Sequence, residues 1–256
     1  MIFSWNGKTI HYADEGTGRA VVLLHGLGGN SENWILQRRL LSETHRVLSI
    51  DLPGHGLSTG RTIGFTEYPE AIGAMLDHAR VERATLCGLS TGARTGLAFA
   101  VRDLDRVSGV VIVNAFLHLE PHDCAKRLAL YDLLLEEDGQ RQWADQLLAL
   151  MGVEEHPAII RGFLRSLNHI DPLHIRRIFR EQIQWDQRPD LKNVHCPVLV
   201  MRGAKDRFIP AYCFDEIRAG LSRSKLAVLE AGHLPYLEKP AEFNQAVAQF
   251  LHENRL

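Results

Sequence analysis

The chain of 256 residues is 45% hydrophobic and carries 29 lysines and arginines against 31 aspartates and glutamates. Such a length and apolar content fit one large globular domain, or a domain with an insertion. The balanced charge argues against general nucleic-acid binding, and no apolar run approaches the roughly 20 residues that span a bilayer. The four cysteines lack metal-ligand spacing and residues 1–8 lack the layout of a signal peptide, so we expect free thiols, no metal and a cytoplasmic protein.

Eight short runs have the composition of β-strands. The first two, 3–5 and 9–13, are joined by Asn6-Gly7, a favourable hairpin turn. Ser31 is placed to cap a helix after the third run, and helical patterns also occupy 67–79, 93–101 and 240–252. The alternation of strands and helices predicts a mostly parallel sheet covered on both faces. The remaining six runs are 20–24, 46–50, 83–87, 107–113, 197–201 and 225–229.

The alternation pauses between about residues 116 and 190, which contain no convincing strand. Asp171-Pro172 is typical of a helix start. We expect residues 116–190 to form a helical lid over the sheet edge where ligands bind, with 1–115 and 191–256 as the core. The alternative is a set of packing helices without substrate contact. Two helical faces are predicted there, one with Leu128, Tyr131, Leu134 and Leu135, the other with Trp143, Leu147, Leu148 and Met151.

Gly88-Leu89-Ser90-Thr91-Gly92 has the pattern of a nucleophile elbow, a sharp turn from strand to helix that exposes a serine hydroxyl. A serine needs a histidine base, which a carboxylate holds in place. Asp206 follows the strand 197–201, and His233 follows the strand 225–229. Because the carboxyl ends of parallel strands share one edge, these sequence-distant residues can meet. We therefore predict the catalytic triad Ser90, Asp206 and His233.

An oxyanion hole needs two donors aimed at the developing negative oxygen. The backbone N–H of Thr91 is one candidate, and that of Leu27, in the glycine-rich loop 25–29, is the other. A glycine-rich loop can also bind phosphate, but neither nucleotide-binding glycine motif is present.

The motifs together resemble those of the α/β-hydrolase superfamily over nearly the whole length. The resemblance implies an eight-stranded, mostly parallel sheet with a helical lid after the sixth strand, and no metal or cofactor. The chain is most similar to the small cytosolic branch of carboxylesterases, enol-lactonases, carbon–carbon bond hydrolases and cofactor-free haloperoxidases. The matching segments are 25–29, 51–58, 88–92, 203–206 with Pro210, and 232–233 with Pro240.

Two departures from the relatives shift the expected substrate. Thr91 stands where many relatives have methionine or glutamine, and Leu234 stands where the carbon–carbon hydrolases often have tryptophan. We therefore expect a serine hydrolase that cleaves an ester, lactone or thioester of a small to medium, partly apolar substrate through an acyl-enzyme. The alternatives are carbon–carbon bond hydrolysis, acyl transfer, or a ligand-sensing protein that retains the triad.

The sequence indicates substrate contacts and partners less specifically than it indicates the triad. Trp34 and Leu89 are candidates for the pocket, and Arg94 is a candidate anchor for a carboxylate, although each also fits a structural role. An acyl-carrier or coenzyme A-linked substrate is one interpretation of an arginine-rich part of the lid, and a solvated helix face is the other. The substrate itself and the oligomeric state are not specified by the sequence. The arginines concerned are Arg161, Arg165, Arg176, Arg177 and Arg180.

Overall fold

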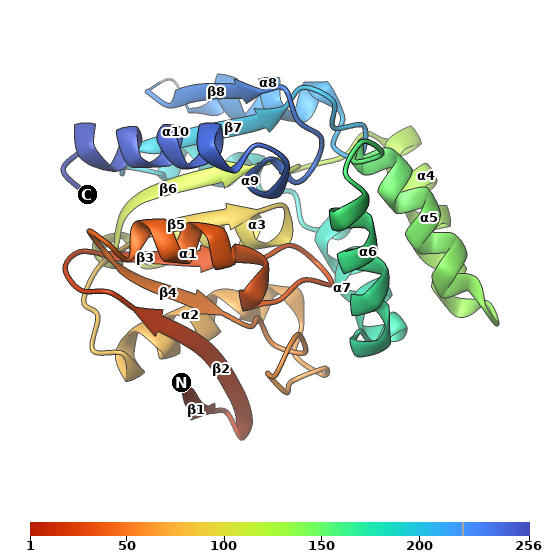
Figure 1. Cartoon of the computed structure of the whole chain (residues 1–256), viewed down its shortest axis with the longest axis horizontal. Helices are drawn as coiled ribbons and strands as arrows, with labels where there is room; N and C mark the ends of the chain where they lie inside the picture. The colour runs from red at the N-terminus through yellow and green to blue at the C-terminus, as the bar shows by residue number, and fades with distance from the viewer. Residues whose placement is uncertain (222) are drawn as a thin grey trace.

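A computed structural model describes residues 1–221 and 223–256. Its eight strands form one sheet in the order β1-β2-β4-β3-β5-β6-β7-β8 (Figure 1). Strand β1 pairs antiparallel with β2, and β2 with β4, whereas β3 to β8 are parallel. The predicted mostly parallel, eight-stranded sheet is thus confirmed. The strands are β1 (Ile2–Trp5), β2 (Lys8–Glu15), β3 (Ala20–Leu24), β4 (Arg46–Ile50), β5 (Ala84–Leu89), β6 (Val107–Val113), β7 (Val198–Gly203) and β8 (Lys225–Leu229).

Helices cover both faces of the sheet. In Figure 1, α1 and α10 lie in front of the sheet, and α2, α3 and α8 lie behind it. Each face has its own hydrophobic cluster, and neighbouring residues of one strand divide between them: Leu86 joins the α2–α3 side and Cys87 the α1–α10 side. The helices are α1 (Ile35–Leu41), α2 (Tyr68–His78), α3 (Thr91–Arg102), α4 (Pro121–Asp132), α5 (Gly139–Met151), α6 (Pro157–Ser166), α7 (Pro172–Gln184), α8 (Ala211–Gly220), α9 (Pro235–Glu238) and α10 (Pro240–Glu253).

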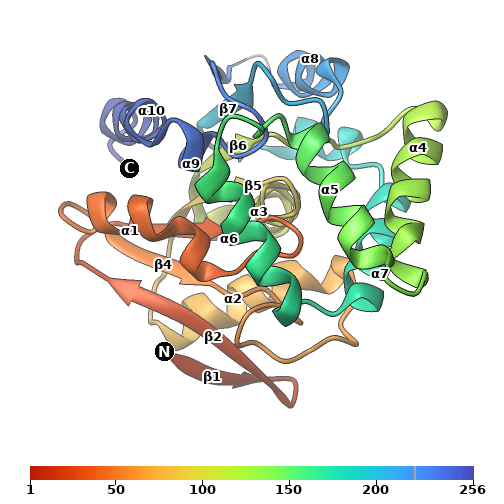
Figure 2. The same ribbon diagram turned by 45° about the vertical axis from the view of Figure 1, so that its right-hand side comes forward.

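Helices α4 to α7 follow β6 and precede β7 in the sequence. In space they lie beyond the carboxyl ends of the parallel strands (Figure 1). In the turned view they come forward as a group over that edge (Figure 2), and we use the name lid for residues 116–190, which contain them. Helix α7 begins as its sequence predicts, because the Asp171 side chain accepts the backbone N–H groups of Leu173 and His174. No helix in the described part of the chain is long and apolar enough to cross a membrane.

Two local predictions need correction. Asn30, not Ser31, caps the turn after β3, since its side chain accepts the Glu32 N–H. Leu135 is exposed, because α4 ends at Asp132 and the tighter 3-10 turn that follows rotates Leu135 away from the helical face. Strand β8 forms at the predicted residues 225–229, and as an edge strand it has a largely exposed surface.

Candidate active site

Ser90 sits on a strained turn between β5 and α3, with φ 51° and ψ −111°. Such a backbone is costly for a residue with a Cβ and persists where the surroundings hold it. The neighbouring glycines make the turn possible. A Cβ at Gly88 would collide with the backbone of Gly92 and Ala93, and a Cβ at Gly92 would collide with the carbonyl of Leu24. The Ser90 N–H is tied to the carbonyl oxygen of Val113 at 2.9 Å.

Asp206 and His233 meet at the adjacent end of the sheet. Asp206 Oδ2 lies 2.8 Å from Nδ1 of His233, and both side chains are buried. The other oxygen, Oδ1, accepts the backbone N–H groups of Phe208 and Ile209. The carboxylate is thus fixed on one side and presents its free oxygen to the imidazole, which is the arrangement that orients a catalytic histidine.

The His233 loop is held in place by two residues that the sequence does not identify, Asn114 and Glu238. Asn114 is buried, has φ 42° at the end of β6, and donates its amide to the carbonyls of Gly232 and His233. It also accepts the N–H of Gly203. Glu238 accepts the N–H groups of Gly232 and Leu234, on either side of His233. The position of Asn114 directly after a buried apolar strand is a sequence signal that could have identified it. Nothing in the sequence distinguishes Glu238 from other glutamates.

The loop after β3 forms a tight turn, and its residues line the same cavity as Ser90. The Gly29 N–H donates to the Gly26 carbonyl, and Gly28 has φ +79°, as the third residue of a type II turn requires. His25 Nε2 accepts the Leu52 N–H, so Nδ1 carries the proton and donates to the Gly26 carbonyl. Burial lowers the pKa of His25, in agreement with this neutral form. The hydrogen bond that closes this turn joins Gly29 to Gly26 and does not use the Leu27 N–H.

Thr91 is the first residue of α3, and the first N–H groups of a helix have no partner within it. The positive end of the helix dipole lies at the same point. The Thr91 side chain is directed away to the lid, where its hydroxyl donates to Gln182. The backbone N–H groups of Thr91 and Leu27 therefore belong to the two segments that border Ser90.

Ser90 and His233 line one cavity of about 330 Å³, which we call the apolar chamber. Leu27 and Leu89 also line it, and so do residues of α5 and α6. Among the described residues, no aspartate, glutamate, lysine or arginine lines it. Its apolar lining includes Tyr131, Leu147, Met151, Ile159, Phe163 and Phe208.

Helix α5 of the lid is hydrogen-bonded directly to the loops that carry Asp206 and His233. The Met151 carbonyl accepts the His233 N–H at 2.6 Å, and the Leu150 carbonyl accepts the Arg207 N–H at 2.9 Å. These carbonyls belong to the last turn of α5, where no partner exists within the helix. Gly152 ends the helix with φ +71°, packed against the Lys205 carbonyl. The lid and the acid and histidine loops thus form one hydrogen-bonded unit.

Two proposed substrate contacts lie outside the apolar chamber. Trp34 is fully buried and stacks on Tyr236 with ring centroids 4.3 Å apart, so it supports the wall from behind. Arg94 is also fully buried; its guanidinium donates to the carbonyls of Gln182 and Trp185 and to the Gln187 side chain. Burial lowers its pKa to about 9. We therefore assign Arg94 to anchoring the end of the lid, not to binding a substrate carboxylate.

The lid arginines are largely paired within the molecule. Arg176 and Arg180 both face Asp132, at 2.7 and 3.7 Å. Arg177 pairs with Glu181 and donates to backbone carbonyls of the loop after β4. Three of the five arginines thus have structural partners, which reduces the basic face that an acyl carrier would need. Within the two described segments, no group of three His, Cys, Asp or Glu side chains could hold a metal ion.

Known proteins match both the sequence and the fold. The chain is 30% identical to a putative carbamate hydrolase of Caulobacter sp., over 94% of each chain. It is 29% identical to an acetyltransferase component of the acetoin cleaving system of Pseudomonas putida, covering 93% of this chain and only 64% of that protein. The enol-lactonase of Burkholderia xenovorans superposes with a TM-score of 0.88 at 25% identity, over 98% of this chain and all of that one.

The alpha/beta hydrolase family model matches residues 21–246, which include β3, the serine turn, the lid and the His233 loop. The resemblance inferred from the sequence motifs is thereby confirmed. The chain belongs to the alpha/beta hydrolase family and is a hydrolase.

Proposed function

We propose that this protein is a serine hydrolase that cleaves an ester, lactone or thioester bond through an acyl-enzyme. Two observations support the proposal together: Ser90 and His233 line one apolar chamber, and His233 is hydrogen-bonded to Asp206. A serine hydroxyl is a weak nucleophile at neutral pH and needs such a base. The likeness to an enol-lactonase and a putative carbamate hydrolase supports attack on an acyl carbon.

The proposed reaction has two stages. His233 Nε2 takes the proton of Ser90 Oγ as the oxygen attacks the carbonyl carbon, while the N–H groups of Leu27 and Thr91 stabilise the oxyanion. Asp206 stabilises the imidazolium, which then gives its proton to the leaving oxygen or sulfur. Water, deprotonated by His233, attacks the acyl-enzyme in the second stage and releases the acid and the free serine.

The apolar chamber indicates the substrate class. A carboxylate or phosphate placed there would lose its hydration without a cationic side chain to replace it, because His233 is the only residue with a basic side chain among the described lining residues. We propose a small to medium substrate that is uncharged near the scissile bond. Leu234 also lines the chamber, in the place where the carbon–carbon hydrolases often have tryptophan, and this favours ester-type substrates.

The test is a panel of p-nitrophenyl esters of increasing acyl length, lactones and thioesters, assayed with the wild type, Ser90→Ala and, as a control, Ser42→Ala, a serine outside the chamber. We expect sustained turnover that falls by several orders of magnitude in Ser90→Ala alone, since the covalent route is lost. Near-normal turnover by Ser90→Ala would refute the mechanism. A single turnover with a persistent acyl adduct in the wild type would instead indicate the ligand-sensing alternative.

A further inference from the structure

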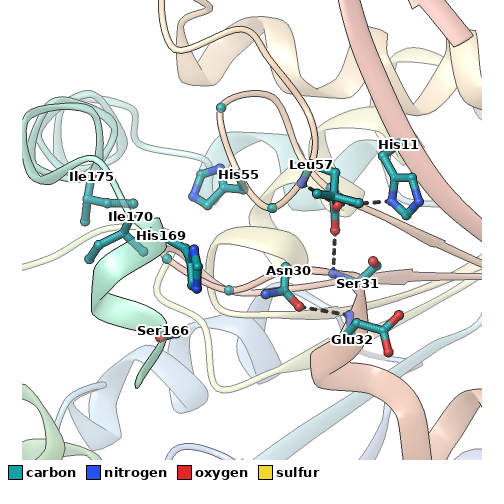
Figure 3. Close-up of a pocket in the computed structure, with 15 residues that line it drawn as sticks. His11, Asn30, Ser31, Glu32, His55, Leu57, Ser166, His169, Ile170 and Ile175 are labelled. Carbon is teal, nitrogen blue, oxygen red and sulfur yellow. Dashed lines mark hydrogen bonds and ion pairs between the residues drawn. The ribbon is translucent and has the colours of Figure 1, made fainter. Parts of the chain in front are cut away.

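A second cavity of about 380 Å³, which we call the polar chamber, adjoins the apolar one. Gly28, Gly29, Asn30 and Ser166 line both, so the two chambers meet at the loop after β3 and at the end of α6. Figure 3 shows its walls: β2, the loop and turn after β3, the loop after β4, and the lid segment that carries Ser166 and His169.

The polar chamber differs from the apolar one in its lining. Three histidines and two carboxylates line it, namely His11, His55, His169, Glu32 and Asp51. No lysine or arginine lines it among the residues that the structure describes. A ligand group that carries a carboxylate or phosphate would therefore meet two carboxylates and no permanent cation.

Both carboxylates are already engaged. Asp51 accepts the N–H groups of Ser31 and Leu57 and lies 3.1 Å from His11 Nδ1. Burial alone would raise the pKa of Asp51, but these backbone hydrogen bonds hold it below its ordinary value. Glu32 pairs with Arg38 at 2.8 Å. Asp51 thus remains ionised, and both carboxylates already have partners within the chain.

His55 offers a free acceptor. Its Nδ1 lies 3.1 Å from the Pro53 carbonyl and so carries the proton, which leaves Nε2 as an acceptor. Burial holds the pKa of His55 well below its ordinary value, so the ring is neutral. Nε2 is buried and has no partner within the described chain. A buried acceptor without a partner costs free energy, which a donor group recovers once the atoms that cover Nε2 move aside.

The position of the leaving group during the reaction decides which part of a substrate can reach this chamber. His233 must protonate the leaving atom, so the leaving group lies on the His233 side. None of the described residues of the loops after β7 and β8 lines the polar chamber, which adjoins the loop after β3 instead. We propose that it is a second subsite of the proposed hydrolase, for a neutral hydrogen-bond donor (a hydroxyl or amide N–H) at the distal end of the acyl group.

The experiment compares p-nitrophenyl esters of unbranched acids in three matched series: unsubstituted, ω-hydroxy and ω-carboxy, each of increasing length. Because the leaving group is constant, differences report the acyl end. At one chain length we expect kcat/KM to favour the ω-hydroxy ester over the unsubstituted one by roughly tenfold, the worth of one hydrogen bond. The ω-carboxy ester should be the poorest substrate. A ratio near one at every length would overturn the proposal.

A variant separates the subsite from general polarity effects. His169 is exposed, lines only the polar chamber, and faces it from the lid (Figure 3). His169→Phe should narrow the chamber and bring the ratio of kcat/KM for the ω-hydroxy ester to that for the unsubstituted ester of the same length close to one. His195→Phe, an exposed histidine outside both chambers, should keep the wild-type preference. An unchanged preference in His169→Phe would overturn the proposal.

This inference rests on the proposed function, and a binding measurement keeps the two apart. Titration calorimetry on Ser90→Ala with the methyl amides of the same three acid series measures the subsite without turnover. A tenfold tighter binding of the ω-hydroxy amide supports the subsite even if no ester is hydrolysed by the wild type. Equal affinities in all series refute it even if the wild type is an efficient esterase.

Discussion

At the scale of single residues, Asn114 ties together the loops that hold Asp206 and His233. Its amide accepts one N–H, from Gly203, and donates to the carbonyls of Gly232 and His233. Asn114→Ala removes all three hydrogen bonds in a buried site, which should cost about 1–3 kcal/mol of unfolding free energy. We expect kcat to fall by roughly 10–100-fold with little change in KM, because a displaced base weakens the transition state more than the bound ester.

A control for Asn114→Ala is Asn254→Ala, whose amide donates to the Phe250 carbonyl at the far end of α10. That variant should keep kcat. If Asn114→Ala lost stability but kept the wild-type kcat, Asn114 would have a structural role only.

The sequence predicts where Ser90, Asp206 and His233 lie, but it does not predict which side chains bind backbone groups, as Glu238 does. Ser90, Asp206 and His233 each follow a strand of the parallel sheet, so their order along the chain is enough to predict that they lie at one edge. Glu238 contacts backbone N–H groups that any sequence would offer. Arg94 lies in α3, close in sequence to Ser90, which suggested a contact with substrate. The sequence does not show that the carbonyls of Gln182 and Trp185 surround its guanidinium.

At the scale of elements, the C-terminus of α5 fixes the acid and histidine loops, and Gly152 is the point of closest approach. A Cβ at Gly152 would collide with the Lys205 carbonyl, one residue before Asp206. We expect Gly152→Ala to lower kcat for p-nitrophenyl esters by at least about tenfold, because a shift of the loops misplaces the base. Steady-state kinetics with one ester, together with urea unfolding, measure both effects.

Gly7→Ala is a matched control for that substitution. Gly7 also has φ +71°, but a Cβ there would meet no atom within 4 Å. Both variants carry the same left-handed strain, which costs on the order of 1 kcal/mol, and only Gly152→Ala adds the collision. Equal kcat in the two variants would contradict the proposed coupling of α5 to the triad.

The sequence predicted the elements better than their edges. Apolar runs and the Asp171 cap marked strands and α7 correctly, since these signals are local. The exposure of β8 and of Leu135 depended on which strand ends the sheet and where α4 ends, and neither is a local property.

At the scale of the whole molecule, neutral buried histidines make stability depend on pH. Burial lowers the pKa of His25, His55 and His174 below that of an unfolded histidine, about 6.5. Below pH 6.5 the unfolded chain therefore binds more protons at these sites than the folded one. The free energy of unfolding should fall between pH 7.5 and 5.5, by up to about 1.4 kcal/mol per histidine and pH unit below 6.5.

Urea unfolding of the wild type and His55→Gln at both pH values isolates one of these groups. Tyr68, His25 and His174 face His55, and only the histidines titrate in this range. The variant should lose less stability than the wild type on acidification. Asp51, whose pKa is lowered, adds its own loss only as the pH approaches 4 and below. Equal losses in both proteins would show that His55 does not remain neutral.

The central claim is that Ser90 is the nucleophile of a covalent mechanism, and labelling tests it most directly. The protein is incubated with diisopropyl fluorophosphate, and mass spectrometry of the intact chain and its peptides follows. We predict one phosphoryl adduct per chain, on the peptide that contains Ser90, with parallel loss of esterase activity and no adduct on Ser90→Ala. Full esterase activity in an unlabelled wild type, or an inactivating adduct on another residue, would contradict the mechanism.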